Sequence, residues 1–234
     1  MIDLPEVLQT AYPKGIVKGP DKSHRISPSR LLNCMRGAFM KSLGYDRQND
    51  SISEQNLSYG TMRHSALQKR LLDLGMLLNP DGSLADGDEY HEEMLQMDDP
   101  PFLGYMDGRL KADNSSGAAV LEIKTIGKKL SAILTPQYNH YDQALLYMYV
   151  TGLPEAYILY ESKLEKSPSV PWKQFVVPYD EERANALIKR GRDLLKALET
   201  RKIPLPDKDC YCRMPEVCFN KKIQQEEELG GFII

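Results

Sequence analysis

The segment from residue 102 to residue 126 constrains the fold more than any other part of the chain. Residues 102–112 and 118–126 have the composition and alternation of β-strands, and the sequence DNSSG between them is typical of a turn. We expect a hairpin in which Ala112 lies opposite Gly117, because the turn sets the register of both strands. Each position of one strand then has a defined partner on the other.

This register brings three charged side chains together. Glu122 and Lys124 share one face of their strand, Ile123 lies on the other face, and Asp107 lies across from Glu122. Placing these groups on an otherwise apolar strand costs free energy unless they pair with each other or bind a cation. Two interpretations follow: a structural ion pair between Lys124 and one acid, or a catalytic metal site.

Periodic patterns elsewhere predict alternating helices and strands. The expected helices cover residues 28–44, 53–78, 138–150 and 181–201, and the further strands cover residues 90–97, 156–161 and 173–177. This order indicates an α/β fold with a central mixed sheet flanked by helices.

The size and composition of the chain suit one folded domain. With 234 residues, 41% of them hydrophobic, the chain can bury a sizeable core. We expect an N-terminal extension at residues 1–26, a single domain at residues 27–220 and a flexible acidic tail at residues 221–234.

The formal net charge of −3 does not favour a protein that coats nucleic acid through bulk charge. An enzyme that gathers acidic residues around metal ions remains compatible with this balance. No apolar run is long enough to span a bilayer, and the first 15 residues lack the pattern of a secretory signal. We therefore expect a cytoplasmic protein with no membrane partner.

The arrangement of Asp107, Glu122 and Lys124 resembles the signature of the PD-(D/E)XK nuclease superfamily, with Asp-Gly where the family name has Pro-Asp. Further motifs resemble its RecB-like branch. The opening helix of that branch resembles the segment SPSRL, which leads to Cys34. The helix that carries its metal-binding histidine resembles YGTMRH, which ends at His64. Its glutamine and tyrosine motif resembles Gln143-x-x-x-Tyr147. The resemblance implies a restriction-endonuclease-like core over most of residues 27–218.

The resemblance also implies a role for each site residue. Mg²⁺ or Mn²⁺ would be held by His64, Asp107, Glu122 and the main-chain carbonyl of Ile123, while Lys124 orients the attacking water.

Gln143 and Tyr147 would position the DNA strand. Taken alone, His64 is also compatible with a histidine packed in the core. Gln143 and Tyr147 are likewise compatible with the packing face of a helix. Gln137-x-x-x-Tyr141 has the same spacing as the chosen pair, so it is an alternative match.

The four cysteines suggest a second metal centre. Cys34 lies far upstream of Cys210, Cys212 and Cys218, a distribution that resembles RecB-like nucleases with a 4Fe-4S cluster. Such a cluster would join the N-terminal helix to the closing segment, residues 204–220. One residue separates the second and third cysteines, where the family usually has two. Structural Zn²⁺ is the alternative, because four thiolates also suit that ion.

Taken together, the motifs predict a metal-dependent deoxyribonuclease, most simply an exonuclease acting on single-stranded DNA or DNA ends in recombination, replication or repair. The relatives that it resembles include CRISPR adaptation nucleases and the nuclease domains of helicase–nucleases, and the resemblance is compatible with a phage-encoded chain. A helicase, recombination or CRISPR adaptation protein is therefore an expected partner. A non-catalytic DNA-end-binding subunit and a structure-specific endonuclease are the alternatives.

Overall fold

The computed structural model describes residues 16–18, 25–47, 51–164, 172–207 and 210. The chain divides into two compact units, each described here by itself. One contains residues 50–97 and 103–185, and the other contains residues 1–49, 98–102 and 186–234. Within the described part, no helix is long and apolar enough to cross a membrane.

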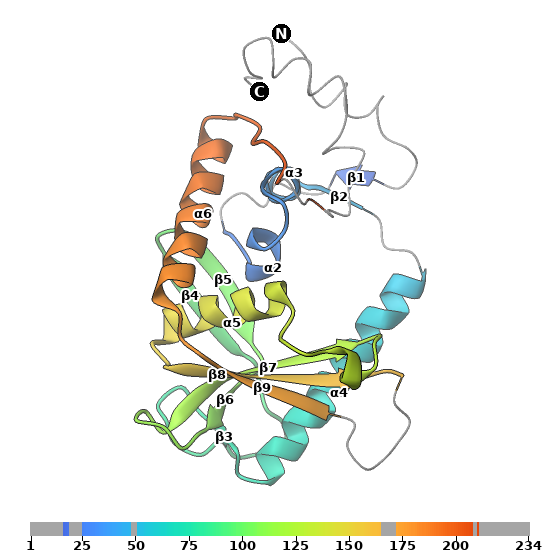
Figure 1. Cartoon of the computed structure of the whole chain (residues 1–234), viewed down its shortest axis with the longest axis vertical. Coiled ribbons are helices and arrows are strands. Elements are labelled where there is room, and N and C mark those ends of the chain that lie inside the picture. The colour runs from blue at the N-terminus through green and yellow to red at the C-terminus, as the bar shows by residue number, and fades with distance from the viewer. Residues whose placement is uncertain (1–15, 19–24, 48–50, 165–171, 208–209, 211–234) are drawn as a thin grey trace. The chain divides into compact units, whose positions relative to one another are not determined.

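A five-stranded mixed sheet forms the centre of the first unit (Figure 1). Strands β7 and β8 run parallel, joined through a helix, and every other neighbouring pair is antiparallel. In spatial order the strands are β3 (Leu77–Leu78), β6 (Gly108–Lys111), β7 (Ala118–Ile126), β8 (Glu155–Ser162) and β9 (Trp172–Pro178). The predicted central mixed sheet is therefore confirmed.

Two helices cover opposite faces of this sheet (Figure 1). Helix α4 (Ser51–Asp73) packs its leucines, such as Leu67, against the face that carries Ile123. Helix α5 (Tyr138–Thr151) covers the other face, where Lys124 contacts it, and ends at Gly152 with a φ of 71°. A 3-10 turn, η1 (Leu130–Ala132), precedes α5. The charged face of β7 thus lies beneath α5.

The predicted hairpin register is confirmed, but its first strand is divided. The Ala112 N–H donates to the Gly117 carbonyl (3.0 Å), and Gly108 pairs with Leu121. Strand β5 (Pro101–Met106) instead pairs with β4 (Glu93–Asp98) in a separate two-stranded sheet. The prediction of one continuous strand was wrong because the chain changes partner at Asp107.

The predicted helix at 53–78 ends earlier than expected. Helix α4 stops at Asp73, Gly75 adopts a φ of +64°, and the chain continues into β3. Leu74, directly after the end of α4, is 67% exposed. Leu77 and Leu78 are buried, as strand residues beside β6.

The other unit contains the opening helices. Strand β1 (Ile16–Lys18) pairs with β2 (Tyr45–Arg47), and most of helix α6 (Glu181–Glu199) belongs to this unit. The predicted single helix at 28–44 is two helices, α2 (Pro28–Leu31) and α3 (Met35–Ser42). The Arg190 guanidinium donates to the carbonyls of Leu31 (3.1 Å) and Asn33 (2.6 Å), which stabilises the break between them.

Candidate active site

Asp107 occupies the point where the chain passes from β5 to β6, and each of its acceptor groups has a partner. Its Oδ2 accepts a hydrogen bond from the Ile123 N–H (2.6 Å), and its Oδ1 lies 3.3 Å from Nδ1 of His64. Its main-chain carbonyl accepts from the Gln68 side-chain amide (2.7 Å). The aspartate is therefore held in one orientation by a strand on one side and by helix α4 on the other.

Helix α4 contributes both His64 and Gln68 because residues four apart lie on the same helix face. Burial lowers the pKa of His64, but the hydrogen bond and charge of Asp107 outweigh burial, and the net shift is upward. A metal ion would require the neutral imidazole, so its binding would displace any proton on His64. Gln68, which is buried, was missed by the sequence analysis.

The helix is fastened to the sheet near His64 by an ion pair. The Arg63 guanidinium donates to both carboxylate oxygens of the buried Glu161, on β8. Gly60, one helical turn before His64, is not needed for a close approach of α4 to the sheet, because a Cβ there would meet no heavy atom within 4 Å among the described residues.

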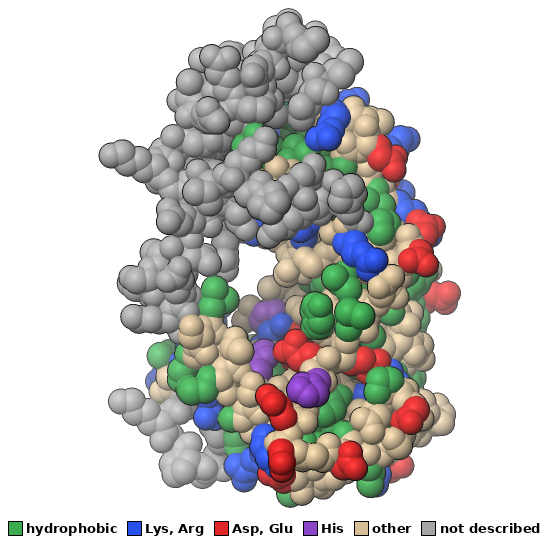
Figure 2. All heavy atoms as spheres, turned by 180° about the vertical axis from the view of Figure 1, so that it is seen from behind, with side chains coloured by type: hydrophobic (Ala, Val, Ile, Leu, Met, Phe, Trp, Pro, Cys, Tyr) green, Lys and Arg blue, Asp and Glu red, His purple; other side chains and the backbone are tan. Residues whose placement is uncertain are grey.

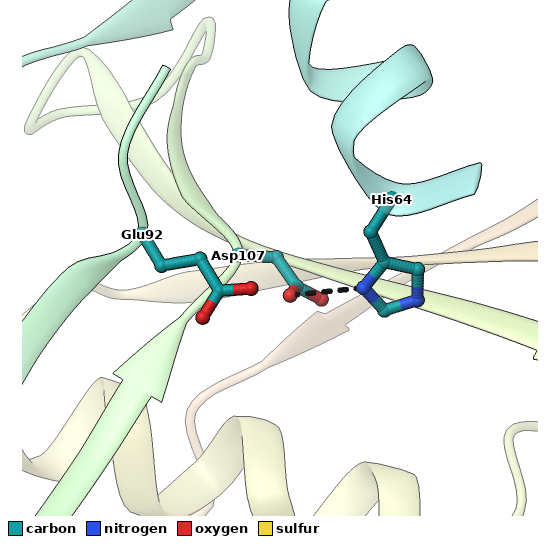
Figure 3. A group of neighbouring side chains, drawn as sticks. All are labelled: His64, Glu92 and Asp107. Carbon is teal, nitrogen blue, oxygen red and sulfur yellow. Dashed lines mark ion pairs between the residues drawn. The ribbon is translucent and has the colours of Figure 1, made fainter. Parts of the chain in front are cut away.

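Glu92, which the sequence analysis did not predict, completes a group of three side chains that could hold a metal ion. One ligand atom from each of His64, Glu92 and Asp107 lies within 4.8 Å of the others, and the three side chains converge in Figure 3. Partial burial and the negative charge of Asp107 raise the pKa of Glu92. A divalent cation would relieve this repulsion.

The segment that carries Glu92 is fixed on both sides by one arginine. The Glu93 carboxylate accepts two hydrogen bonds from the Arg109 guanidinium, at 2.9 and 3.2 Å. The Tyr90 hydroxyl accepts from the Arg109 N–H and donates to the Leu78 carbonyl. Arg109 lies two residues after Asp107, so the same strand that positions the aspartate also positions Glu92.

Glu122 differs from Asp107 because it is buried without a full set of partners. The side chain is 1% exposed; Oε1 pairs with the Lys124 ammonium, and Oε2 has no hydrogen-bond partner among the described residues. Burial raises the pKa of Glu122 to about 7, although Lys124 opposes the shift. Burial alone would lower the pKa of Lys124, but Glu122 and Asp107 reverse that effect.

A chain of hydrogen bonds leads from Lys124 into helix α5. Lys124 Nζ donates to Gln143 Oε1 (3.1 Å), Gln143 Nε2 donates to the Tyr147 hydroxyl (3.0 Å), and that hydroxyl donates to the Tyr105 carbonyl (2.7 Å). The predicted glutamine and tyrosine therefore lie at the charged face of β7.

The alternative match, Gln137 and Tyr141, occupies a different position. Gln137 is the N-cap residue of α5, and its N–H donates to the Tyr160 hydroxyl. The contacts with Lys124 favour the chosen pair.

The cysteines lie in the other unit. Cys34 is the N-cap residue of α3 and not, as expected, inside a helix; its side chain is buried, and neither it nor Cys210 forms a disulfide. Cys210 is partly buried. Cys212 and Cys218 lie outside the described residues.

Asp207 links the two described cysteine positions. Its carboxylate accepts from the Met35 N–H (3.3 Å) and from the Arg190 guanidinium (2.8 Å), and its carbonyl accepts from the Cys210 N–H (3.1 Å). The closing segment is thus held against the start of α3, beside Cys34.

Acidic, histidine and basic side chains lie side by side on the exposed surface of the unit that contains the five-stranded sheet, as Figure 2 shows.

Neither a protein-family model nor a curated protein sequence matches the chain.

Solved structures resemble it at low identity. LHK-Exo in complex with dAMP has a TM-score of 0.51 and 13% identity over 77% of this chain and 90% of that one. A phage-related exonuclease from Haemophilus somnus 129PT has a TM-score of 0.50 and 10% identity over 76% and 96%. An alkaline exonuclease from Laribacter hongkongensis, LHK-Exo, has a TM-score of 0.49 and 13% identity over 89% and 96%. The first two matches show that the chain shares the fold of these exonucleases.

Proposed function

We propose that this chain is a divalent-metal-dependent deoxyribonuclease that removes nucleotides from the end of a DNA strand. The observation that carries the proposal is the buried Oε2 of Glu122, which has no partner among the described residues and belongs to the same site as Asp107. An unpaired carboxylate oxygen in a protein interior is costly, and a cation is the partner that it lacks.

The donor set fits a hard divalent cation. Ligand atoms of His64, Glu92 and Asp107 lie within 4.8 Å of one another, and Glu122 and the main-chain carbonyl of Ile123 would complete the set. Carboxylate and carbonyl oxygens with one imidazole suit Mg²⁺ or Mn²⁺. A cation held there supplies neutralisation of the phosphate charge. His64 and Asp107 form one side of this site and Glu122 the other.

The remaining residues act on the nucleophile and the strand. Lys124 has a partly buried ammonium that orients an attacking water and offsets the negative charge of the site. Gln143 fixes this ammonium, and Tyr147 fixes Gln143 through a bond to the main chain. The pair therefore positions Lys124 and, through it, the strand at the scissile phosphate.

The choice of DNA and of an end-directed reaction rests on the solved structures with the same fold. Their names describe exonucleases, and one was solved with the mononucleotide dAMP. A single strand or a free end is the matching substrate here, and helicase, recombination or CRISPR adaptation proteins are the partners that would supply such ends.

Cleavage assays on two DNA forms test the proposal. End-labelled linear and covalently circular single strands would be incubated with the chain in Mg²⁺, in Mn²⁺ and in EDTA, with E122Q as the matched inactive control. We expect mononucleotides from the linear strand alone, only with metal. Cutting of the circle would indicate an endonuclease, and binding of ends without any cleavage would indicate a non-catalytic subunit.

We further propose that Cys34, Cys210, Cys212 and Cys218 hold one 4Fe-4S cluster. Asp207 supports this proposal by keeping Cys210 beside the start of α3, whose N-cap is Cys34. The cluster would tie the closing segment to the opening helices.

The metal content tests this assignment. Anaerobically purified protein should be brown, and C34S should bleach it and lower its melting temperature. Colourless protein that contains one equivalent of zinc would show that the cysteines hold the alternative metal. Four reactive thiols without bound metal would contradict both the cluster and the zinc assignment.

A further inference from the structure

Helix α5 presents a third polar side chain on the face that carries Gln143 and Tyr147. His140 precedes them by three and seven residues, so the three positions share one helix face. Gln143 contacts Lys124 and Tyr147 contacts Gln143. His140 has no part in the mechanism proposed above, although the same face places it at the same site.

The hydrogen bonds of His140 assign its proton. Its Nδ1 lies 2.9 Å from the hydroxyl of the buried Tyr160, and that hydroxyl also accepts from the Gln137 N–H (3.0 Å). A tyrosine hydroxyl has one hydrogen to donate. If it donates to Nδ1, every group in this trio is satisfied, whereas the opposite tautomer leaves the hydroxyl hydrogen without an acceptor among the described residues. His140 therefore carries its proton on Nε2.

The surroundings of His140 keep the ring neutral and place it near a cation. Tyr160 on β8 is the direct partner of Lys124 on β7 in the parallel register, so both side chains lie on the face that α5 covers. Burial, followed by the charge of Lys124, lowers the pKa of His140 to about 4. The ring is thus a neutral N–H donor beside an ammonium, and Nε2, being protonated, is closed to a metal ion.

We propose that His140 is a substrate-contacting residue whose Nε2–H donates a hydrogen bond to a non-bridging phosphate oxygen of the DNA strand. This inference rests on the proposed nuclease function. Among the described residues Nδ1 makes the only hydrogen bond of the His140 side chain, so the Nε2–H is available. A donor beside Lys124 suits an anionic acceptor, and the phosphate is the anion that the reaction brings to this site.

Two isosteric substitutions separate this role from a structural one. H140N keeps a polar atom at the position of Nδ1 and so retains the bond to Tyr160, but it lacks a donor at the Nε2 position. H140Q reaches the Nε2 position with its amide and loses the Nδ1 contact. A substrate contact predicts that H140N is impaired and H140Q is rescued, whereas a purely structural role predicts the reverse.

The assay measures kcat and KM on a single-stranded oligodeoxynucleotide with Mn²⁺, and anisotropy measures binding of the same labelled strand with Ca²⁺. We expect H140N to lower kcat/KM by about 10- to 100-fold, the range for a hydrogen bond to a charged group, with weaker strand binding and an unchanged melting temperature. H140Q should remain close to wild type.

The outcomes distinguish the two levels of the proposal. Wild-type activity in H140N, or loss in H140Q with activity retained in H140N, would overturn the role of His140 while leaving the nuclease intact. Failure of the wild-type chain to cleave or bind DNA with metal would overturn the nuclease proposal and this inference with it.

Discussion

Asp107 and Glu122 face each other across one hairpin, but their carboxylates differ in their hydrogen-bond partners. Asp107 has a partner for Oδ1, Oδ2 and its carbonyl, whereas Glu122 has one oxygen paired with Lys124 and one buried without a partner among the described residues. The first carboxylate is held in position by the fold alone. On the proposed function, a bound cation would supply the partner that the second carboxylate lacks. This contrast would then place preorganisation on one side of the site and ligand dependence on the other.

The largest expected effect is the loss of cleavage on removing either carboxylate. D107A and E122Q should each lower kcat/KM by about 10³-fold or more, because metal ions contribute several kcal/mol of transition-state stabilisation. Single-turnover cleavage of an end-labelled strand measures this. Near-wild-type cutting by E122Q would remove Glu122 from the metal site.

Unfolding of the same two variants without metal sharpens the contrast. D107A should lose about 1–3 kcal/mol of unfolding free energy, because it leaves the Ile123 N–H buried without its acceptor. E122Q keeps an acceptor for Lys124 and should change metal-free stability little. Equal losses in urea titrations of D107A and E122Q would show that the fold supports both carboxylates alike.

Glu92 tests whether the Asp107 side of the site also binds the cation. E92Q should weaken Mn²⁺ binding by about 10- to 100-fold, as expected when water replaces one ligand or support of a metal site. E89Q removes the same charge from an exposed position in the same segment and is the control. Isothermal titration with Mn²⁺ measures both. An E92Q affinity equal to that of E89Q would leave Glu92 as a surface acid.

The features that the sequence predicted depend on local interactions, whereas the features that it missed depend on contacts between residues far apart in the chain. The positions of Asp107, Glu122 and Lys124 follow from strand alternation and one turn, both local properties, and the hairpin register confirmed them. Glu92 owes its place to the ties of its neighbours to Arg109, which no local pattern encodes.

The opening helix illustrates the same limit. Local propensity favoured one continuous helix, but Arg190, more than 150 positions away, binds the carbonyl of Leu31 at the end of α2 and that of Asn33 within the break. Cys34 consequently caps α3. Long-range side-chain hydrogen bonds of this kind decide where elements end, and periodicity carries no information about them.

Gln68 gives a smaller effect on the preorganised side. Q68L removes the donor to the Asp107 carbonyl, so we expect about a tenfold fall in kcat/KM and a loss of about 1–2 kcal/mol in unfolding free energy. Q96L changes an exposed glutamine on β4 and is the control. If Q68L cleaves DNA as fast as Q96L, the side-chain contacts of Asp107 alone are enough to orient it.

The smallest expected effect is a pH dependence of folding on the Lys124 side of the site. His140, which faces Tyr160 and Lys124, has its pKa lowered from 6.5 to about 4, so the folded state favours the neutral ring. The unfolded chain therefore binds the extra proton first, and stability that is fully present above pH 6.5 is lost as the pH falls through 4. With allowance for partial exposure of the ring, the loss is about 1–2 kcal/mol.

Glutamine does not titrate, so metal-free H140Q should lose less unfolding free energy than wild type between pH 7 and pH 4.5 in urea titrations, by about that amount. H91Q, which changes an exposed histidine, controls for loss of an imidazole. Identical pH profiles for wild type and H140Q would show that His140 is not kept neutral by its surroundings, and the contrast between the two sides of the site would then rest on the carboxylates alone.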